Sequence, residues 1–208
     1  MFLTFEGVDC SGKTTQAAIL VEALRASSDT PVHFIREPGG TAISERLREI
    51  LLDRSNLELS ELTELFLFSA SRAQLVAQII LPALGRGEIV VCDRFYDSTT
   101  AYQGYGRGLD LDAVRRINAV ATAGTDPDLT VLVDITVGEI EARKKASGSA
   151  VDRMENAGRA FYERVRKGYL AIAREQPGRF VIIDGMRHVN DIALDIRRAV
   201  EERLGQLH

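Results

Sequence analysis

The chain has 208 residues, of which 45% are hydrophobic and 27% are charged, and its formal net charge at pH 7 is −4. This composition is typical of a globular protein and excludes an intrinsically disordered chain. The acidic balance gives no general electrostatic attraction to nucleic acid or to anionic membranes, so any positive charge that binds phosphate must be local. The length predicts a single domain over residues 1–208.

The N-terminal run and the cysteines indicate the compartment. Residues Met1 to Phe5 are largely apolar, but the run ends at Glu6 and is too short for the core of a signal peptide. No run of about 18 apolar residues, the length of a membrane-spanning helix, occurs later. Cys10 and Cys92 lack the paired spacing of a zinc site and are expected to be reduced thiols. The sequence therefore predicts a cytoplasmic protein.

Short apolar runs along the chain predict buried strands. Continuous β-branched runs of this kind are typical of a parallel sheet that is covered on both faces. In chain order the predicted strands are Phe2–Glu6, His33–Arg36, Ile89–Asp93, Thr130–Asp134 and Phe180–Asp184.

Stretches with helical periodicity lie between these strands. Strand and helix alternate throughout, which predicts an α/β doubly wound fold with helices on both faces of a five-stranded parallel sheet. A capping box formed by Thr136 and Glu139 is expected to begin the helix that runs through Lys145. The other predicted helices are Thr14–Ala26, Ser44–Leu52, Glu61–Leu84, Leu111–Ala123 and Ala157–Glu175.

A glycine-rich motif lies between the first strand and the first helix and matches G-x-x-x-x-G-K-[ST]. Glycines allow several backbone N–H groups to face one anion, and the helix N-terminus adds partial positive charge. Lys13 is expected to reach the β- and γ-phosphates of ATP, and the Thr14 hydroxyl to bind Mg²⁺. The predicted ATP-binding residues of this P-loop are Gly7, Val8, Asp9, Cys10, Ser11, Gly12, Lys13 and Thr14.

A P-loop alone does not identify the phosphoryl acceptor, because switches, motors, transporters and kinases all use it. The chain lacks the Asn-Lys-x-Asp stretch of a guanine-selective switch. Arg36 and Glu37 begin an Arg-Glu-Pro-Gly-Gly-Thr segment after the second strand. This segment is either a simple turn or part of a ligand site at the carboxyl edge of the sheet.

Two further groups of residues favour a nucleotide as the acceptor. Phe68 and Arg72 share a helix face, where they can stack on a base and hydrogen-bond its edge, although Phe68 alone fits a core position. Asp93 could lie near Mg²⁺ and Arg94 could clamp a phosphate, with an exposed salt bridge as the alternative. Hydroxyls and an amide suited to a sugar and a base edge follow at Ser98, Thr99, Tyr102 and Gln103.

Together these motifs resemble thymidylate kinases of the bacterial type. The segments Phe-Glu-Gly-Val-Asp-x-Ser-Gly-Lys-Thr-Thr-Gln, Arg-Glu-Pro-Gly-Gly-Thr, Phe-Ser-Ala-Ser-Arg and Asp-Arg-Phe-Tyr-Asp-Ser-Thr-Thr-Ala-Tyr-Gln-Gly occur in the family's order between Phe5 and about Leu170. The resemblance implies a homodimer that phosphorylates dTMP to dTDP with ATP and Mg²⁺, a step of dTTP biosynthesis. The alternatives are a kinase for another nucleoside or monophosphate, and a P-loop ATPase that is not a kinase.

The resemblance also implies roles for individual residues. Phe68 would stack on thymine, Arg72 would donate to its O4, and Gln103 would read the remaining base edge. The Arg72 donor opposes cytosine, which carries an amino group at that place. The other implied contacts are Tyr102 at the ribose 2′ position, Asp9 at the 3′-hydroxyl, Arg94 at the acceptor phosphate, and Glu37 near the Mg²⁺-bound water and the phosphates.

A basic segment over residues 143–159 interrupts the predicted pattern and is either a surface loop or a mobile flap. The resemblance identifies it with the family's LID. Cys10 stands where eukaryotic members carry arginine and bacterial members usually glycine, so the cation for the transferring group must come from this segment. We expect Arg143 and Lys145 to be catalytic together with Lys13 and Arg94. Arg143 and Arg153 are also expected to bind ATP.

Overall fold

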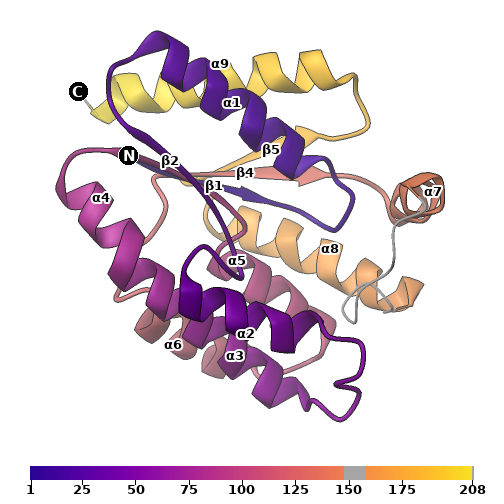
Figure 1. Cartoon of the computed structure of the whole chain (residues 1–208). Coiled ribbons are helices and arrows are strands. Elements are labelled where there is room, and N and C mark those ends of the chain that lie inside the picture. Colours follow the sequence, from indigo (N-terminus) through magenta and orange to yellow (C-terminus); the bar gives the residue numbers. More distant parts are fainter. Residues whose placement is uncertain (148–157, 208) are drawn as a thin grey trace.

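The structure, a computed structural model, describes residues 1–147 and 158–207. Its centre is one sheet of five parallel strands in the order β2-β3-β1-β4-β5 (Figure 1). All the predicted strands are confirmed, and two of them begin one residue earlier than expected. The strands are β1 (Phe2–Glu6), β2 (Val32–Arg36), β3 (Ile89–Asp93), β4 (Leu129–Asp134) and β5 (Phe180–Asp184).

Helices cover both faces of the sheet, as predicted (Figure 1). On one face lie α1 (Lys13–Ser27) and α9 (Val189–Leu207), which pack on each other. Near the carboxyl ends of the strands lies α7 (Val137–Ser147). On the other face lie α2 (Ala42–Leu52), α3 (Glu61–Leu75), η1 (Val76–Ile80), α4 (Leu81–Gly85), α5 (Tyr96–Thr99), η2 (Thr100–Gly106), α6 (Leu111–Ala121) and α8 (Arg159–Glu175).

The central strands β1 and β3 are buried along their whole length, as a covered parallel sheet requires. Alternate side chains point to opposite faces. Leu3 and Phe5 pack in the cluster formed with α1 and α9, whereas Phe2 packs with η1, α4 and Phe95 on the other side. This arrangement holds the carboxyl end of β1, and therefore the P-loop, rigidly in the middle of the sheet.

The structure corrects three helix predictions. The expected single helix Glu61–Leu84 contains a π-helical turn, η1, between α3 and α4. Residues 96–106 form α5 and η2, where the sequence showed only polar groups and two glycines. Helix α9 was not predicted at all, although Ile192, Ile196 and Val200 bury one face of it.

The predicted helix start at Thr136 is confirmed in part. The Thr136 hydroxyl accepts a hydrogen bond from the Glu139 amide at 3.3 Å. The Glu139 carboxylate does not complete the box, because it accepts from Arg143 at 2.6 Å instead. Thr136 is thus correctly predicted as the residue that caps α7. Glu139 instead pairs with Arg143, one of the expected catalytic residues.

Candidate active site

The glycine-rich loop after β1 has the backbone conformation of an anion cradle. Gly7 and Gly12 have φ values of 142° and 92°, which favour glycine. A Cβ at Gly7 would lie 2.5 Å from the Val133 carbonyl oxygen, so the loop also packs too closely on β4 for any side chain there. Cys10 has φ 60°, a left-handed conformation that costs a residue with a Cβ about 1 kcal/mol.

The side chains at the phosphate end of the site surround this loop. Lys13 is buried, and burial together with nearby Arg94 lowers its pKa despite the neighbouring carboxylates. The Thr14 hydroxyl donates to Asp93 Oδ2 at 2.5 Å, while the buried Asp93 Oδ1 has no partner among the described residues. An orphaned carboxylate oxygen beside a hydroxyl fits a hydrated Mg²⁺, which takes few protein ligands and completes its shell with phosphates and water.

Arg94 is paired with Asp9 and not with its neighbour Asp93. Its Nη2 donates to Asp9 Oδ1 at 2.5 Å, and its Nη1 donates to the Gly7 carbonyl at 3.0 Å. Burial acts to raise the pKa of Asp9, but Arg94 and Lys13 outweigh it, so the pKa lies below its ordinary value. The exposed salt bridge considered for Asp93 and Arg94 is therefore absent, and the guanidinium faces the cradle from a mostly buried position.

A buried carboxylate lies beneath Arg94. Glu6 accepts from the Phe95 amide at 2.7 Å and from the Ser98 and Tyr169 hydroxyls at 2.6 and 2.9 Å. Burial, assisted by nearby Asp97, raises the pKa of Glu6 to about 7. Arg94 also donates to the Ser98 and Tyr169 hydroxyls, so Glu6 helps to fix the guanidinium through these two residues. The sequence did not indicate Glu6 or Tyr169 as parts of the site.

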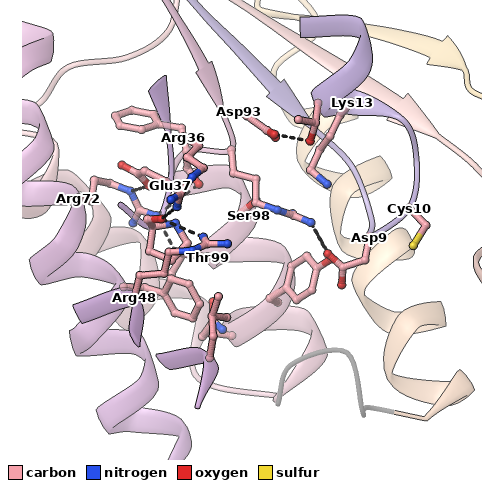
Figure 2. Close-up of a pocket in the computed structure, with 18 residues that line it drawn as sticks. Asp9, Cys10, Lys13, Arg36, Glu37, Arg48, Arg72, Asp93, Ser98 and Thr99 are labelled. Atoms are coloured by element: carbon pink, nitrogen blue, oxygen red, sulfur yellow. Dashed lines mark hydrogen bonds and ion pairs between the residues drawn. The ribbon is translucent and has the colours of Figure 1, made fainter. Parts of the chain in front are cut away.

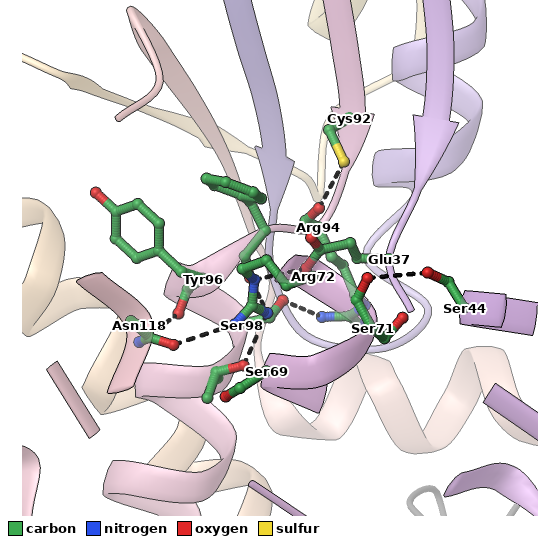
Figure 3. Close-up of polar contacts among 12 residues, drawn as sticks. Glu37, Ser44, Ser69, Ser71, Arg72, Cys92, Arg94, Tyr96, Ser98 and Asn118 are labelled. Atoms are coloured by element: carbon green, nitrogen blue, oxygen red, sulfur yellow. Dashed lines mark hydrogen bonds and ion pairs between the residues drawn. The ribbon is translucent and has the colours of Figure 1, made fainter. Parts of the chain in front are cut away.

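At the other end of the site, Arg72 is buried among residues from three other segments (Figure 3). Its Nε donates to Glu37 at 2.8 Å, one Nη1 hydrogen binds Asn118 at 3.1 Å, and Nη2 binds Thr99 at 2.9 Å and the Phe95 carbonyl at 3.4 Å. A guanidinium carries five N–H groups, so these contacts leave one Nη1 hydrogen for a ligand.

Glu37 is the charge partner of Arg72. Burial raises the pKa of Glu37 to about 7, although Arg72 acts to lower it. Its Oε1 has no hydrogen-bond partner among the described residues. Arg36 next to it donates to the Pro38 carbonyl and to Glu45, both at 2.9 Å. The Arg-Glu-Pro-Gly-Gly-Thr segment is thus part of the site and more than a turn.

One cavity of about 400 Å³ joins the two ends. Figure 2 shows Lys13, Asp9 and Cys10 at one end and Arg36, Arg48 and Arg72 at the other. Arg48 and Leu52 also line the cavity, although the sequence did not indicate them. All the residues expected to bind dTMP line it, namely Asp9, Arg36, Glu37, Phe68, Arg72, Arg94, Ser98, Thr99, Tyr102 and Gln103.

Phe68 is half-buried and both lines this cavity and packs against the core cluster on α8, so the two readings of it are compatible. Three other residues of the cavity have polar groups that hydrogen-bond to protein side chains. The Thr99 hydroxyl is engaged by Arg72, and the Tyr102 hydroxyl accepts from Arg94 at 3.3 Å. Gln103 is buried and donates to Glu64 at 2.9 Å.

The expected basic residues of the LID differ in placement. The Arg143 guanidinium donates to the carbonyls of Cys10, Ser11 and Gly185 at 3.1, 3.2 and 2.9 Å. Since the amides of a P-loop face the phosphates, an arginine on these carbonyls braces the loop from outside. Lys145 is exposed and does not line the cavity. Arg153 lies outside the described residues.

Comparisons with known proteins point to one family. A family model described as thymidylate kinase matches residues 5–196. A thymidylate kinase of Pelotomaculum thermopropionicum is 49% identical over 98% of this chain and 94% of its own length. One of Desulfovibrio desulfuricans is 46% identical, covering 98% and 96%. The crystal structure of thymidylate kinase from Ehrlichia chaffeensis superposes with a TM-score of 0.78 at 36% identity, over 97% of this chain and 98% of that one.

Proposed function

Because this chain belongs to the thymidylate kinase family, and so phosphorylates dTMP with ATP in the route to dTTP, we propose that its cavity binds dTMP along its length. The base lies between Phe68 and Arg72, and the phosphate lies at Arg94 beside the P-loop. One observation carries this proposal: the residues expected to contact dTMP, which come from distant segments, line a single cavity that ends at Lys13 and Thr14.

The acceptor phosphate is held at the phosphate end by Arg94. This guanidinium is fixed by Asp9, Gly7, Ser98 and Tyr169, so it loses little further freedom when it binds a phosphate. Lys13 binds the phosphates of ATP. Thr14 and Asp93 hold Mg²⁺, which neutralises phosphate charge when bound. A phosphate oxygen of dTMP is already a nucleophile, so positioning and charge stabilisation suffice and no strong general base is needed.

At the base end, Arg72 directs its remaining Nη1 hydrogen to O4 of thymine while Phe68 stacks on the ring. Tyr102 crowds the ribose 2′ position from its place over Arg94, and Asp9 accepts from the 3′-hydroxyl. Asp9 already accepts from Arg94 and Tyr162, but an ionised carboxylate has about four acceptor sites and can take one more donor.

The cation for the transferring phosphoryl group comes from Arg143 or Lys145, because a cysteine at position 10 cannot supply a positive charge. Arg143 is 32% exposed and lies against the P-loop, so it must leave the carbonyls of Cys10 and Ser11 to reach the γ-phosphate. Lys145 is free of such contacts among the described residues. We assign Arg153 to the same ATP-binding group from the sequence alone.

The exposed apolar face of α2 and α3 supports a homodimer. By length and composition alone Glu61–Gly85 could cross a membrane, with 39% of its most apolar stretch buried. Its inner face packs on α2, α6 and β3. Its outer residues Leu62 and Phe66 are 51% and 52% exposed, and Ile43 and Ile50 on α2 are 52% and 45% exposed. Such a patch is typical of an interface, and a cytoplasmic dimer is the assembly we propose.

The kinase assignment is tested by coupled ADP release with each nucleoside monophosphate in turn. ADP formation should require both Mg²⁺ and dTMP. dUMP should be about fivefold weaker, because one methyl contact is worth about 1 kcal/mol. Equal ADP release without any monophosphate would contradict the placement of dTMP in the cavity. For the dimer, Phe66→Lys should convert a dimeric mass by light scattering into a monomeric one.

A further inference from the structure

The amide of Gln103 is held in one orientation by a side chain outside the cavity. Gln103 Nε2 donates to Glu64 Oε1 at 2.9 Å, and both residues are 1% exposed. A carboxylate only accepts, so the NH₂ group of the amide must face Glu64. The carbonyl oxygen Oε1 is then directed away from Glu64. It has no hydrogen-bond partner among the described residues, and Gln103 lines the cavity.

Glu64 is itself fixed in place. Arg107 donates to Glu64 Oε1 and Oε2, both at 3.2 Å, and these contacts fix the position of the buried carboxylate. Glu64 also lies four residues before Phe68, and Phe68 lies four residues before Arg72. The three residues therefore form one row along the same face of α3. At the base end of the cavity, Glu64 on α3 therefore contacts Gln103 on η2, and Phe68 and Arg72 follow Glu64 along the same helix.

We propose that Glu64 is a positioning residue for base selection: it holds Gln103 as a hydrogen-bond acceptor for the N3–H of thymine. The inference rests on the proposed placement of the base between Phe68 and Arg72. Thymine presents an acceptor at position 4 and a donor at position 3. Arg72 supplies a donor for the first, and Gln103, with its NH₂ occupied, supplies an acceptor for the second.

Cytosine presents the opposite pattern, an amino donor at position 4 and an acceptor at N3. A free glutamine amide would simply turn over and donate to N3, which would remove half of the discrimination. Glu64 prevents this rotation, because turning the amide would bring two acceptors, Gln103 Oε1 and Glu64 Oε1, together in a buried place. Selectivity at N3 therefore depends on a residue that does not touch the nucleotide.

The test uses dTMP and 5-methyl-dCMP, which share sugar, phosphate and methyl group and differ only at positions 3 and 4. In Glu64→Gln the new amide can donate or accept, so Gln103 is free to turn. We expect the ratio of kcat/KM for dTMP over 5-methyl-dCMP to fall about tenfold. Most of the change should be in KM, since the phosphates are untouched. Glu64→Asp keeps an acceptor and should retain more of the ratio than Glu64→Gln.

Controls separate this inference from the proposed function. Glu175→Gln changes an exposed glutamate that pairs with Arg115, and it should leave the ratio unchanged. Gln103→Leu removes the acceptor, so an unchanged ratio there would reject the placement of the base itself. A lowered ratio in Gln103→Leu with wild-type ratios in both Glu64 variants would overturn the role of Glu64. If melting curves show that Glu64→Gln does not fold, Glu64→Asp takes its place: the shorter carboxylate should hold the Gln103 amide less well and lower the ratio in part, and a wild-type ratio would overturn the role of Glu64.

Discussion

The two ends of the cavity are built differently. At the phosphate end, one contiguous loop supplies the backbone amides, Lys13 and Thr14, and the sheet fixes that loop directly. At the base end, each reading residue depends on partners from distant segments: Arg72 on Glu37, Thr99 and Asn118, and Gln103 on Glu64. The cradle for the ATP phosphates is therefore largely a local property of the chain, whereas base selection is a property of the packed fold.

The largest expected effect lies at the phosphate end. Lys13→Ala should lower kcat by about 10³-fold, because it removes a positive charge from the transferring group in a buried site. The fold should persist, since the cradle is made by backbone and glycines. Steady-state kinetics and circular dichroism measure the two effects. Turnover within about tenfold of wild type would mean that the loop does not serve transfer.

The second largest effect concerns Arg143 and Lys145, the residues proposed to supply the cation for the transferring phosphoryl group. Arg143→Ala together with Lys145→Ala should lower kcat about 10²-fold or more, with Arg143→Ala the more damaging single change. If Arg143 only braces the P-loop, its loss should instead raise KM for ATP and leave kcat nearly intact. A double variant that keeps more than about a tenth of wild-type kcat would reject both residues as the catalytic cation.

Each end of the cavity also rests on a buried carboxylate with a pKa of about 7, Glu6 below Arg94 and Glu37 beside Arg72. Both pKa values are raised by folding from 4.5, so the native state binds more protons between these values and stability falls as pH rises from about 4.5 to 7. Since each unit of pKa difference is worth about 1.4 kcal/mol, we expect a loss of about 3 kcal/mol per group.

Urea unfolding at several pH values measures this loss. Glu6→Gln and Glu37→Gln should each flatten the pH dependence, while Glu175→Gln should not. A slope that remains unchanged in Glu37→Gln would show that its pKa is not raised. Comparing the two variants also shows which end of the cavity contributes more to the pH dependence of the unfolding free energy.

The smallest expected effect is on base choice. Arg72→Gln replaces a fixed donor by an amide that can present either group to position 4 of the pyrimidine. The ratio of kcat/KM for dTMP over dCMP should fall about tenfold. Melting curves must accompany the kinetics, because the change leaves buried Glu37 without its cation. An unchanged ratio in a folded variant would remove Arg72 from the base edge.

The same contrast explains what the sequence predicted. All five strands and most helices follow from local apolar patterns, and the P-loop follows from a contiguous motif. The turn from α5 into η2 was missed because its glycines and polar residues carry no helical periodicity, and its helix forms through packing on α8. Helix α9 was missed although its apolar spacing is regular.

The residues that support the site were harder to predict. Glu64 has the spacing of Phe68 and Arg72 and could have been proposed from it. Glu6, Asn118 and Tyr169 could not, because their roles come from contacts between residues that lie far apart in the chain, such as the 163 positions between Tyr169 and Glu6. Arg143 was chosen for its charge, and its contacts with carbonyls of the P-loop could not be read from the sequence.

The position of β1 in the middle of the sheet has a consequence for synthesis on the ribosome. Its neighbours arrive late, since Phe2 pairs with Val90 and Leu3 with Leu129, and Arg143 reaches Cys10 from later still. Contacts of such separation form slowly and only once the later segments are available. The nucleotide cradle is thus translated well before the strands and the arginine that complete it. Until β3 is available both edges of β1 are unpaired, and until β4 follows one of them stays unpaired and can pair with other chains.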